Sequence, residues 1–253
     1  MTDKLFGVIP RQTLNNPDSA EERIKNDPYL TRVFSDEIQL IRSRVDKNAK
    51  CIVEIGAAGG NTKLIWPEVI TTDVRAASGV DKVMSGEKFD FSDSSVDVVI
   101  GLDALHHLRS PQQHFNELLR VLKPRGKVFY IEPNWNLFSK ICFKIILKYL
   151  HPEPYDTNAL KWDLTSEDPM MGNQAQAFNI FVRDKNIFSE LFPQFKVEIL
   201  EPTKAISFLL SGGVHTRLPI PGKFLLWIYE NEGKNKNWMN TFSLGRLILL
   251  TKN

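Results

Sequence analysis

Two carboxylates flank a turn of small residues near the start of the chain. Glu54 stands just before Gly56-Ala-Ala-Gly-Gly60, and Asp73 follows Glu54 by 19 residues (73 − 54). Small residues let a ligand approach the backbone of the turn. Asp73 ends the next expected strand, where a carboxylate can accept hydrogen bonds from both hydroxyls of a ribose. This spacing predicts a ribose-containing ligand at the turn.

The charge of the turn indicates which ligand that is. A dinucleotide site would show Gly-x-Gly-x-x-Gly, but Ala58 and Asn61 occupy the second and third glycine positions counted from Gly56. Glu54 would also face a pyrophosphate. S-adenosylmethionine (SAM) carries a sulfonium and an ammonium and no phosphate, so an acidic rim suits SAM better than a dinucleotide.

Five motifs in order over residues 53–126 resemble class I SAM-dependent methyltransferases of the type 11 kind. They are Val53–Gly60, Asp73, Phe89–Asp97 (FDFSDSSVD), Leu105–Leu108 (LHHL) and Arg120–Gly126 (RVLKPRG). Three later stretches are similar to a bacterial subgroup often associated with surface-polysaccharide loci: Glu132–Trp135, His151–Asp156 and Leu210–Gly213.

The resemblance implies that loops after several strands hold SAM. Glu54 would face the methionine ammonium and Asp73 the ribose hydroxyls. The other contacts would come from the turn (Gly56, Ala57, Ala58, Gly60), from a loop beside the adenine (Ser85, Gly86, Glu87), and from the strand end beside the methyl donor (Gly101, Leu102, Asp103).

Two residues depart from the family pattern. Ala58 replaces the usual middle glycine, and its methyl group is tolerated unless φ there is positive. Ser85 stands where many members have an aspartate that reaches the adenine amino group. A serine can still accept that hydrogen bond, so the departure concerns affinity for SAM.

The resemblance implies methyl transfer to an acceptor such as a saccharide or a lipid-linked intermediate. A hydroxyl acceptor needs a general base, for which His106 and Asp103 are the candidates. The alternative for His106 is a structural histidine, and the alternative for the whole chain is a SAM-binding module that senses or scaffolds without turnover. His114 is expected at the surface. No histidines, cysteines and carboxylates share metal-ligand spacing, so no metal is predicted.

Strand-like and helix-like patterns alternate along the chain. Strands are expected at 51–55, 69–73, 96–101, 127–132, 197–200 and 247–251, and helices at 18–45, 111–122 and 183–192. With the resemblance, this predicts an α/β fold: a doubly wound, mostly parallel seven-stranded sheet, Rossmann-like, with a helical insertion after the fifth strand. The intervals 60–69 and 73–83 are too short for full crossover helices.

The chain is expected to form one domain, 1–253. Its parts would be an N-terminal helical cap (1–47), a SAM-binding half (48–132), a helical insertion that covers the substrate (133–178) and the C-terminal part of the sheet (179–253).

Composition narrows the class of protein. The formal net charge is only +2, which does not indicate a nucleic-acid partner. The first ten residues lack the pattern of a secretory signal, and the clearest apolar run, Phe224–Tyr229, is far too short to span a membrane. The two cysteines, Cys51 and Cys142, read as reduced core thiols. These features predict a cytoplasmic protein.

The segment 134–150 has two distinct faces as a helix. Its apolar face would carry Trp135, Phe138, Cys142, Ile145 and Tyr149, and the opposite stripe Lys140, Lys144 and Lys148. One alternative is a buried helix with a lysine edge in water. The other is a substrate lid or a helix at an anionic membrane surface, which would make the protein membrane-peripheral. Residues 225–229 are expected to pack beside it.

Overall fold

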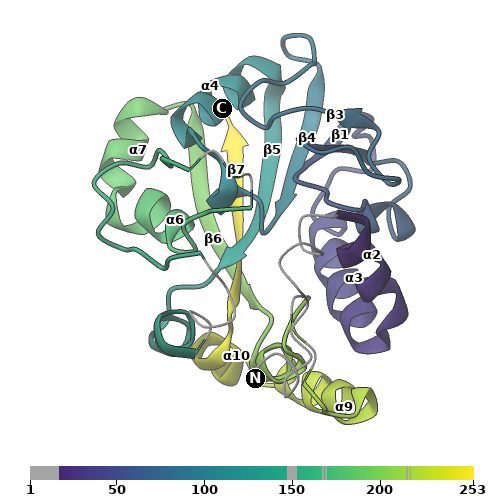
Figure 1. Cartoon of the computed structure of the whole chain (residues 1–253). Coiled ribbons are helices and arrows are strands. Elements are labelled where there is room, and N and C mark those ends of the chain that lie inside the picture. Colours follow the sequence, from purple (N-terminus) through teal and green to yellow (C-terminus); the bar gives the residue numbers. More distant parts are fainter. Residues whose placement is uncertain (1–16, 147–152, 167, 169, 215, 217) are drawn as a thin grey trace.

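The computed structural model describes residues 17–146, 153–166, 168, 170–214, 216 and 218–253. Seven strands form one sheet in the order β3-β2-β1-β4-β5-β7-β6 (Figure 1). Strands β1 to β5 pair in parallel, and β7 is antiparallel to both of its neighbours. The predicted doubly wound, mostly parallel sheet is confirmed. The strands are β1 (Ile52–Ile55), β2 (Ile70–Asp73), β3 (Lys82–Val83), β4 (Val96–Leu102), β5 (Leu122–Pro133), β6 (Phe195–Thr203) and β7 (Gly245–Lys252).

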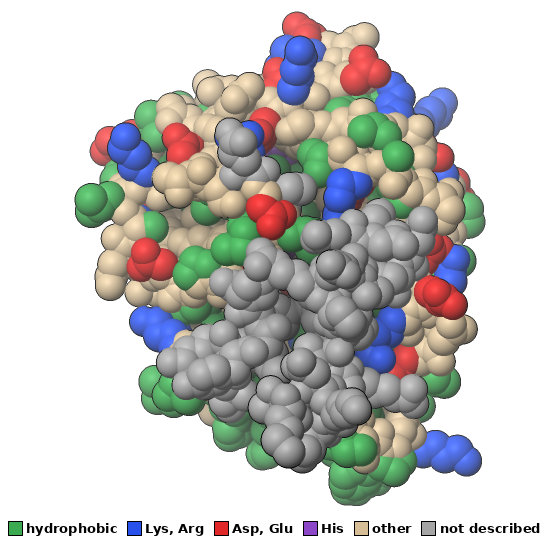
Figure 2. All heavy atoms as spheres, viewed as in Figure 1, with side chains coloured by type: hydrophobic (Ala, Val, Ile, Leu, Met, Phe, Trp, Pro, Cys, Tyr) green, Lys and Arg blue, Asp and Glu red, His purple; other side chains and the backbone are tan. Residues whose placement is uncertain are grey.

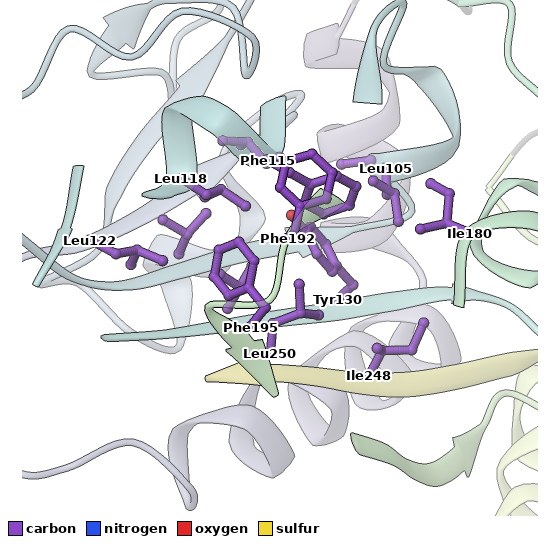
Figure 3. Close-up of a cluster of buried hydrophobic side chains, with 14 of the residues drawn as sticks. Leu105, Phe115, Leu118, Leu122, Tyr130, Ile180, Phe192, Phe195, Ile248 and Leu250 are labelled. Carbon is purple, nitrogen blue, oxygen red and sulfur yellow. The ribbon is translucent and has the colours of Figure 1, made fainter. Parts of the chain in front are cut away.

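The central strands β1, β4 and β5 are buried on both faces of the sheet, as their β-branched and aromatic residues require. Along β5, Val128 and Tyr130 enter one core cluster, while Phe129 and Ile131 enter a second cluster on the opposite face. The first cluster lies beneath α4 (Pro111–Val121) and α7 (Lys185–Leu191) and is rich in aromatic rings (Figure 3). The second packs against α3 (Pro28–Arg42).

The front half of the sheet has short connections, as expected from the sequence. Between β1 and β2 there is only the 3₁₀ turn η1 (Asn61–Leu64), and the described residues between β2 and β3 contain no helix. With no crossover helices in the way, the loops after β1 and β2 can lie close together at the carboxyl edge of the sheet.

The N-terminal helical region breaks into α2 (Pro17–Asn26) and α3. Asp27 caps α3, its carboxylate accepting hydrogen bonds from the backbone N–H groups of Tyr29 and Leu30. Of the five apolar residues at helical spacing in α3, Leu30, Val33, Ile38 and Ile41 are buried and Phe34 is partly buried.

The insertion after β5 begins with α5 (Leu137–Ile141) and continues as the π-helical turn η3 (Cys142–Ile146). Cys142 is buried, but Ile145 is 58% exposed, so the prediction that both lie on one face of a helix is wrong. A π turn has more residues than an α turn, and this rotates Ile145 away from the face of Cys142. Lys140 was expected on a stripe of lysines opposite the apolar face. Its Nζ lies over an aromatic ring, 4.8 Å from the centre of Phe178. Lys148 and Tyr149 lie outside the described residues.

Residues 225–229 do not pack beside the insertion as expected. They belong to α9 (Gly222–Glu232), which packs against α3 and α8 (Ile206–Ser211), with Leu225 buried beside Tyr29 and Leu30. The insertion instead contacts α10 (Lys236–Phe242), where the rings of Phe138 and Phe242 are 5.3 Å apart. The apolar surface of α9 is therefore buried in the cluster that it shares with α3 and not against the insertion. Within the described residues, no helix is both long and apolar enough to cross a bilayer.

Candidate functional site

A cavity of about 650 Å³ opens at the carboxyl edge of the sheet, where open α/β sheets bind ligands. The loops after β1, β2, β3 and β4 line one part of the cavity, and the insertion, α8 and α3 line the rest. Of the residues expected to hold SAM or act in catalysis, the wall includes Gly56, Ala58, Asp73, Ser85, Gly86, Glu87, Leu102, Asp103 and His106.

Four of the expected residues, Glu54, Ala57, Gly60 and Gly101, do not contribute to this wall. Two of the glycines serve packing. A Cβ at Gly101 would come 3.1 Å from a carbon of the Tyr130 ring, and a Cβ at Gly60 would come 2.2 Å from the carbonyl oxygen of Gly79. These two positions therefore allow close approach within the protein.

The turn after β1 contains three residues with left-handed backbone conformations. Gly56, Ala58 and Gly60 have φ of 63°, 48° and 79°. The methyl group of Ala58 would be free of strain only at a negative φ. Because φ is positive, the backbone of Ala58 is strained. The backbone N–H of Ala58 donates to Asp73 Oδ2 at 2.9 Å, which holds the residue in this conformation.

Asp73 is buried, 3% exposed, at the end of β2. Besides Ala58, it accepts hydrogen bonds at Oδ1 from the backbone N–H of Arg75 (2.9 Å) and from Arg75 Nε (3.2 Å). A carboxylate has about four acceptor positions. Three are used here, so Asp73 retains capacity to accept from a ligand hydroxyl.

Glu54 lies just behind the turn, with one oxygen satisfied and the other not. Its Oε1 accepts from the hydroxyl of Thr62 at 2.7 Å, whereas Oε2 is buried without a hydrogen-bond partner among the described residues. Burial raises the pKa of Glu54 to about 7; the hydrogen bond from Thr62 opposes this and the charge of Asp73 adds to it. A cationic ligand nearby would favour the ionised form.

His114 holds the loop 85–87 through the carbonyl oxygen of Gly86. The prediction that His114 lies at the surface is wrong. It is fully buried on α4, with its two ring nitrogens against the carbonyl oxygen of Gly86 and the hydroxyl of Tyr130. Burial lowers its pKa to about 4, so the ring is neutral. Nδ1 must therefore donate to the carbonyl, and Nε2 accepts from Tyr130.

A buried ion-pair group that the sequence did not reveal stands beside Asp103. Lys204 Nζ lies 2.5 Å from Asp103 Oδ2 and 3.4 Å from Glu37 Oε2. Both Asp103 and Lys204 have positive φ, 51° and 46°. Burial raises the pKa of Glu37 to about 7, and the charge of Lys204 opposes that shift. Glu37 and Lys204 come from α3 and from the residue after β6, so no local pattern could have linked them to Asp103.

His106 stands between two glutamates. Glu132, fully buried at the end of β5, accepts from the backbone N–H groups of Ala104 (2.9 Å) and Leu105 (2.7 Å), and its Oε2 lies 2.6 Å from His106 Nδ1. His106 Nε2 lies 3.6 Å from Glu153 Oε2. Burial lowers the pKa of His106, but the charge and hydrogen bond of Glu132, with Glu153 and Asp103, raise it to about 9.

The fold also assembles a group with metal-ligating atoms. His106, His107 and Glu153 each offer one such atom, and the three atoms lie within 4.8 Å of one another. The sequence pattern predicted no metal because Glu153 is far from the histidines along the chain. Its position beside the two histidines could be found only from the fold.

Asp97 has a structural part in the fold, and the two cysteines are free thiols as expected. Asp97 secures a strand–loop junction, because its carboxylate accepts from the backbone N–H groups of Lys50 and Cys51 and pairs with Lys123. Cys51 and Cys142 are free thiols.

Residues 65–130 match the family model described as a methyltransferase domain. No curated protein sequence matches the chain. The fold is similar to the YcgJ protein of Bacillus subtilis (TM-score 0.50, 17% identity, 85% of this chain and 97% of that chain). It is also similar to a chain of the complex between the Haloferax volcanii Trm112 methyltransferase activator and a putative methyltransferase (TM-score 0.52, 13% identity, 94% and 97%).

Proposed function

We propose that this chain, which is a class I SAM-dependent methyltransferase, transfers the methyl group of SAM to a lipid-linked intermediate at the surface of an anionic membrane. The match to a methyltransferase domain and the strand order of the sheet support the class of enzyme. The acceptor and the membrane are the part that we propose. They rest on one observation: the insertion lines the acceptor side of the cavity and exposes an apolar stripe on its outer side.

The residues around the turn fit SAM. The positive-φ turn presents its backbone to the cavity, and Asp73 retains an acceptor position for a ribose hydroxyl. The buried, unpaired oxygen of Glu54 puts negative charge behind the turn, which suits the ammonium of the methionine part. Ser85, Gly86 and Glu87 form the loop on which the adenine would lie.

The chemical step requires little beyond alignment, because the sulfonium of SAM is already an activated methyl donor. Holding donor and acceptor in line is then the main contribution of the protein. A hydroxyl acceptor also needs a group that takes its proton. Asp103 and His106 both reach the cavity wall. Asp103 is the better placed, because both ring nitrogens of His106 already face glutamate oxygens, whereas Lys204 pairs with only one oxygen of Asp103.

The part of the cavity away from the turn has an aromatic wall. Phe34, Phe143 and Phe208 contribute to it from α3, η3 and α8. An apolar acceptor, or the lipid part of one, would bury surface there that a small polar metabolite would not.

On the other side of the insertion, hydrophobic side chains face solvent. Figure 2 shows such side chains along the lower edge of the molecule, where α5, α10 and α9 lie in Figure 1. The apolar edge comprises Leu137, Ile141, Ile145, Phe224, Trp227 and Trp238, all of them 40% exposed or more. Large exposed apolar groups on neighbouring helices mark interaction surfaces.

The charges beside the apolar edge favour an anionic bilayer as its partner. Among the residues described there, four exposed lysines accompany one exposed glutamate: Lys144, Lys223, Lys234, Lys236 and Glu230. Amphipathic helices with lysines and aromatic residues bind in the interface of anionic membranes, where buried apolar area and charge attraction add.

Co-sedimentation with liposomes that contain an anionic lipid tests the membrane part. We expect the wild type to sediment, and the triple variant Leu137→Ser, Ile141→Ser, Ile145→Ser to stay in the supernatant. The matched control changes Leu64, Val83 and Leu160 to Ser, three apolar residues outside the apolar edge that are each more than half exposed. If both variants behave like the wild type, or if neutral liposomes bind as well as anionic ones, the membrane proposal is wrong.

A further inference from the structure

The cavity wall carries three groups that are ordinary metal ligands, the imidazoles of His106 and His107 and the carboxylate of Glu153. The histidines belong to the 3₁₀ turn η2 (Leu105–His107) after β4, and the glutamate comes from the insertion after β5. We propose that this cluster binds a divalent transition-metal ion such as Zn²⁺.

The spacing of the ligand atoms suits such an ion. His106 Nε2 and Glu153 Oε2 are 3.6 Å apart. Two atoms that each lie about 2.0–2.2 Å from a tetrahedral Zn²⁺ are roughly 3.4 Å from each other. The pair therefore already stands at the separation of two metal ligands. The ligand atom of His107 lies no more than 4.8 Å from the other two, within reach of a side-chain rotation.

Residues behind the cluster orient two of the ligands. Glu132, fixed by two backbone N–H groups, holds Nδ1 of His106 and leaves Nε2 for the ion. Gln174 Nε2 donates to Glu153 Oε2 and thereby orients that carboxylate. Metal-binding histidines almost always use their second nitrogen in this way, and ligating carboxylates are themselves hydrogen-bonded.

Charge balance also favours a divalent ion. Glu132 and Glu153 are sheltered, with side chains 0% and 7% exposed, and their ion pairs among the described residues are with His106. A divalent ion held at the cluster balances the charges of these two carboxylates. The nearby Lys204 is paired with Asp103 and Glu37 instead.

The ligand set indicates the class of metal. Two imidazoles and one carboxylate suit Zn²⁺, Co²⁺ or Fe²⁺, whereas Mg²⁺ and Ca²⁺ prefer oxygen ligands. Three protein ligands on a cavity wall leave a position open. An oxygen of the acceptor takes this open coordination position, and this step rests on the proposed function. Metal binding itself does not depend on the acceptor.

Titration of the chelator-treated full chain with Co²⁺, followed by visible absorption, tests the site. We expect one Co²⁺ per chain with a spectrum that differs from that of the aqueous ion, and its displacement by Zn²⁺. Glu153→Gln and His107→Gln should each weaken Co²⁺ binding at least about 10-fold. The matched control, Glu190→Gln on α7, has an exposed glutamate and should bind as the wild type does.

SAM binding and circular dichroism of each variant show whether it is folded. Should Glu153→Gln not fold, His107→Gln decides. If the Co²⁺ spectrum stays that of the aqueous ion, or if the folded variants bind Co²⁺ as the wild type does, the cluster is an ion pair and the metal proposal fails. SAM binding by the wild type is scored separately, so a failure of the metal site is distinct from a failure of the proposed function.

Discussion

The backbone N–H of Ala58 donates to the carboxylate of Asp73, with N and Oδ2 2.9 Å apart. This bond joins the strained residue of the turn after β1 to the carboxylate that ends β2. The two features that the sequence indicated separately are therefore one structural unit, and a change in either should affect the other.

Ala58→Gly should stabilise the protein. A non-glycine residue in the left-handed region costs roughly 1–2 kcal/mol, which exceeds the roughly 0.5–1 kcal/mol of chain entropy that glycine adds to the unfolded state. We expect a gain of about 0.5–1 kcal/mol in the free energy of unfolding by urea, with the Kd for SAM changed by less than about 3-fold.

The control for this change is Ala57→Gly. Ala57 is buried and is not among the residues with positive φ, so glycine there should destabilise the protein. Equal losses of stability in the two variants would contradict the strain at Ala58. A large gain in SAM affinity from Ala58→Gly would show that the methyl group obstructs the ligand.

Asp73→Ala should weaken the binding of SAM and of S-adenosylhomocysteine. Ribose hydroxyls left without a partner in a closed site cost roughly 1–3 kcal/mol, or about 5- to 150-fold in Kd. Calorimetry measures this loss, with Asp90→Ala, an exposed aspartate outside the cavity, as the control. Heat and a thermal shift with NAD, but with neither SAM nor its homocysteine product, would overturn the cofactor assignment.

The stability of the protein without SAM should depend on pH through Glu54. Its folded-state pKa of about 7 lies above the ordinary value of 4.5 for a glutamate, so the folded state holds this proton more tightly than the unfolded state does. The stability contribution is complete below about pH 4.5, falls as the pH rises to 7, and is constant above that. At about 1.4 kcal/mol per pH unit, the total loss is on the order of 3 kcal/mol.

Glu54→Gln should remove this loss. The difference in unfolding free energy between variant and wild type should therefore shift in favour of the variant between pH 4.5 and 7, while SAM binding by the variant weakens. Glu190→Gln, with an exposed side chain, should show a difference that does not depend on pH in this way. A flat difference for Glu54→Gln would mean that the pKa of this carboxylate is the same in the folded and the unfolded protein, so that burial does not raise it.

Lys204→Met should destabilise the protein by about 3–5 kcal/mol, because it leaves Glu37 buried and unpaired and frees Asp103. Adding Glu37→Gln should recover part of that loss, as a double-mutant cycle in urea would show. Lys196→Met, which removes a pair between exposed side chains with Glu198, should cost less than about 1 kcal/mol. Additive effects of the two buried changes would contradict the coupling.

Much of the fold was predictable because local patterns determine it. Runs such as Val96–Gly101 are apolar on both faces, and such runs form central parallel strands. The short intervals around η1 and β3 left no room for crossover helices. The side chains expected around the cofactor were predictable where they follow strand ends, as Asp73 and Asp103 do.

Other features depend on contacts between distant parts of the chain. Lys204 meets Asp103 across 101 residues, and Glu153 meets His106 through the insertion, so neither contact leaves a local signal. Ile145 was misplaced because a regular helical period cannot anticipate a π turn. His114 was misplaced because its partner, the carbonyl oxygen of Gly86, belongs to a loop earlier in the chain.

Transfer of a labelled methyl group tests the central claim most directly. Purified protein is incubated with methyl-labelled SAM and a cell extract divided into membrane lipid and water-soluble fractions. The account predicts label in the lipid fraction with the wild type, and a large loss of that label with Asp73→Ala. Label found only in water-soluble products, or none in either fraction while SAM binds, would contradict it.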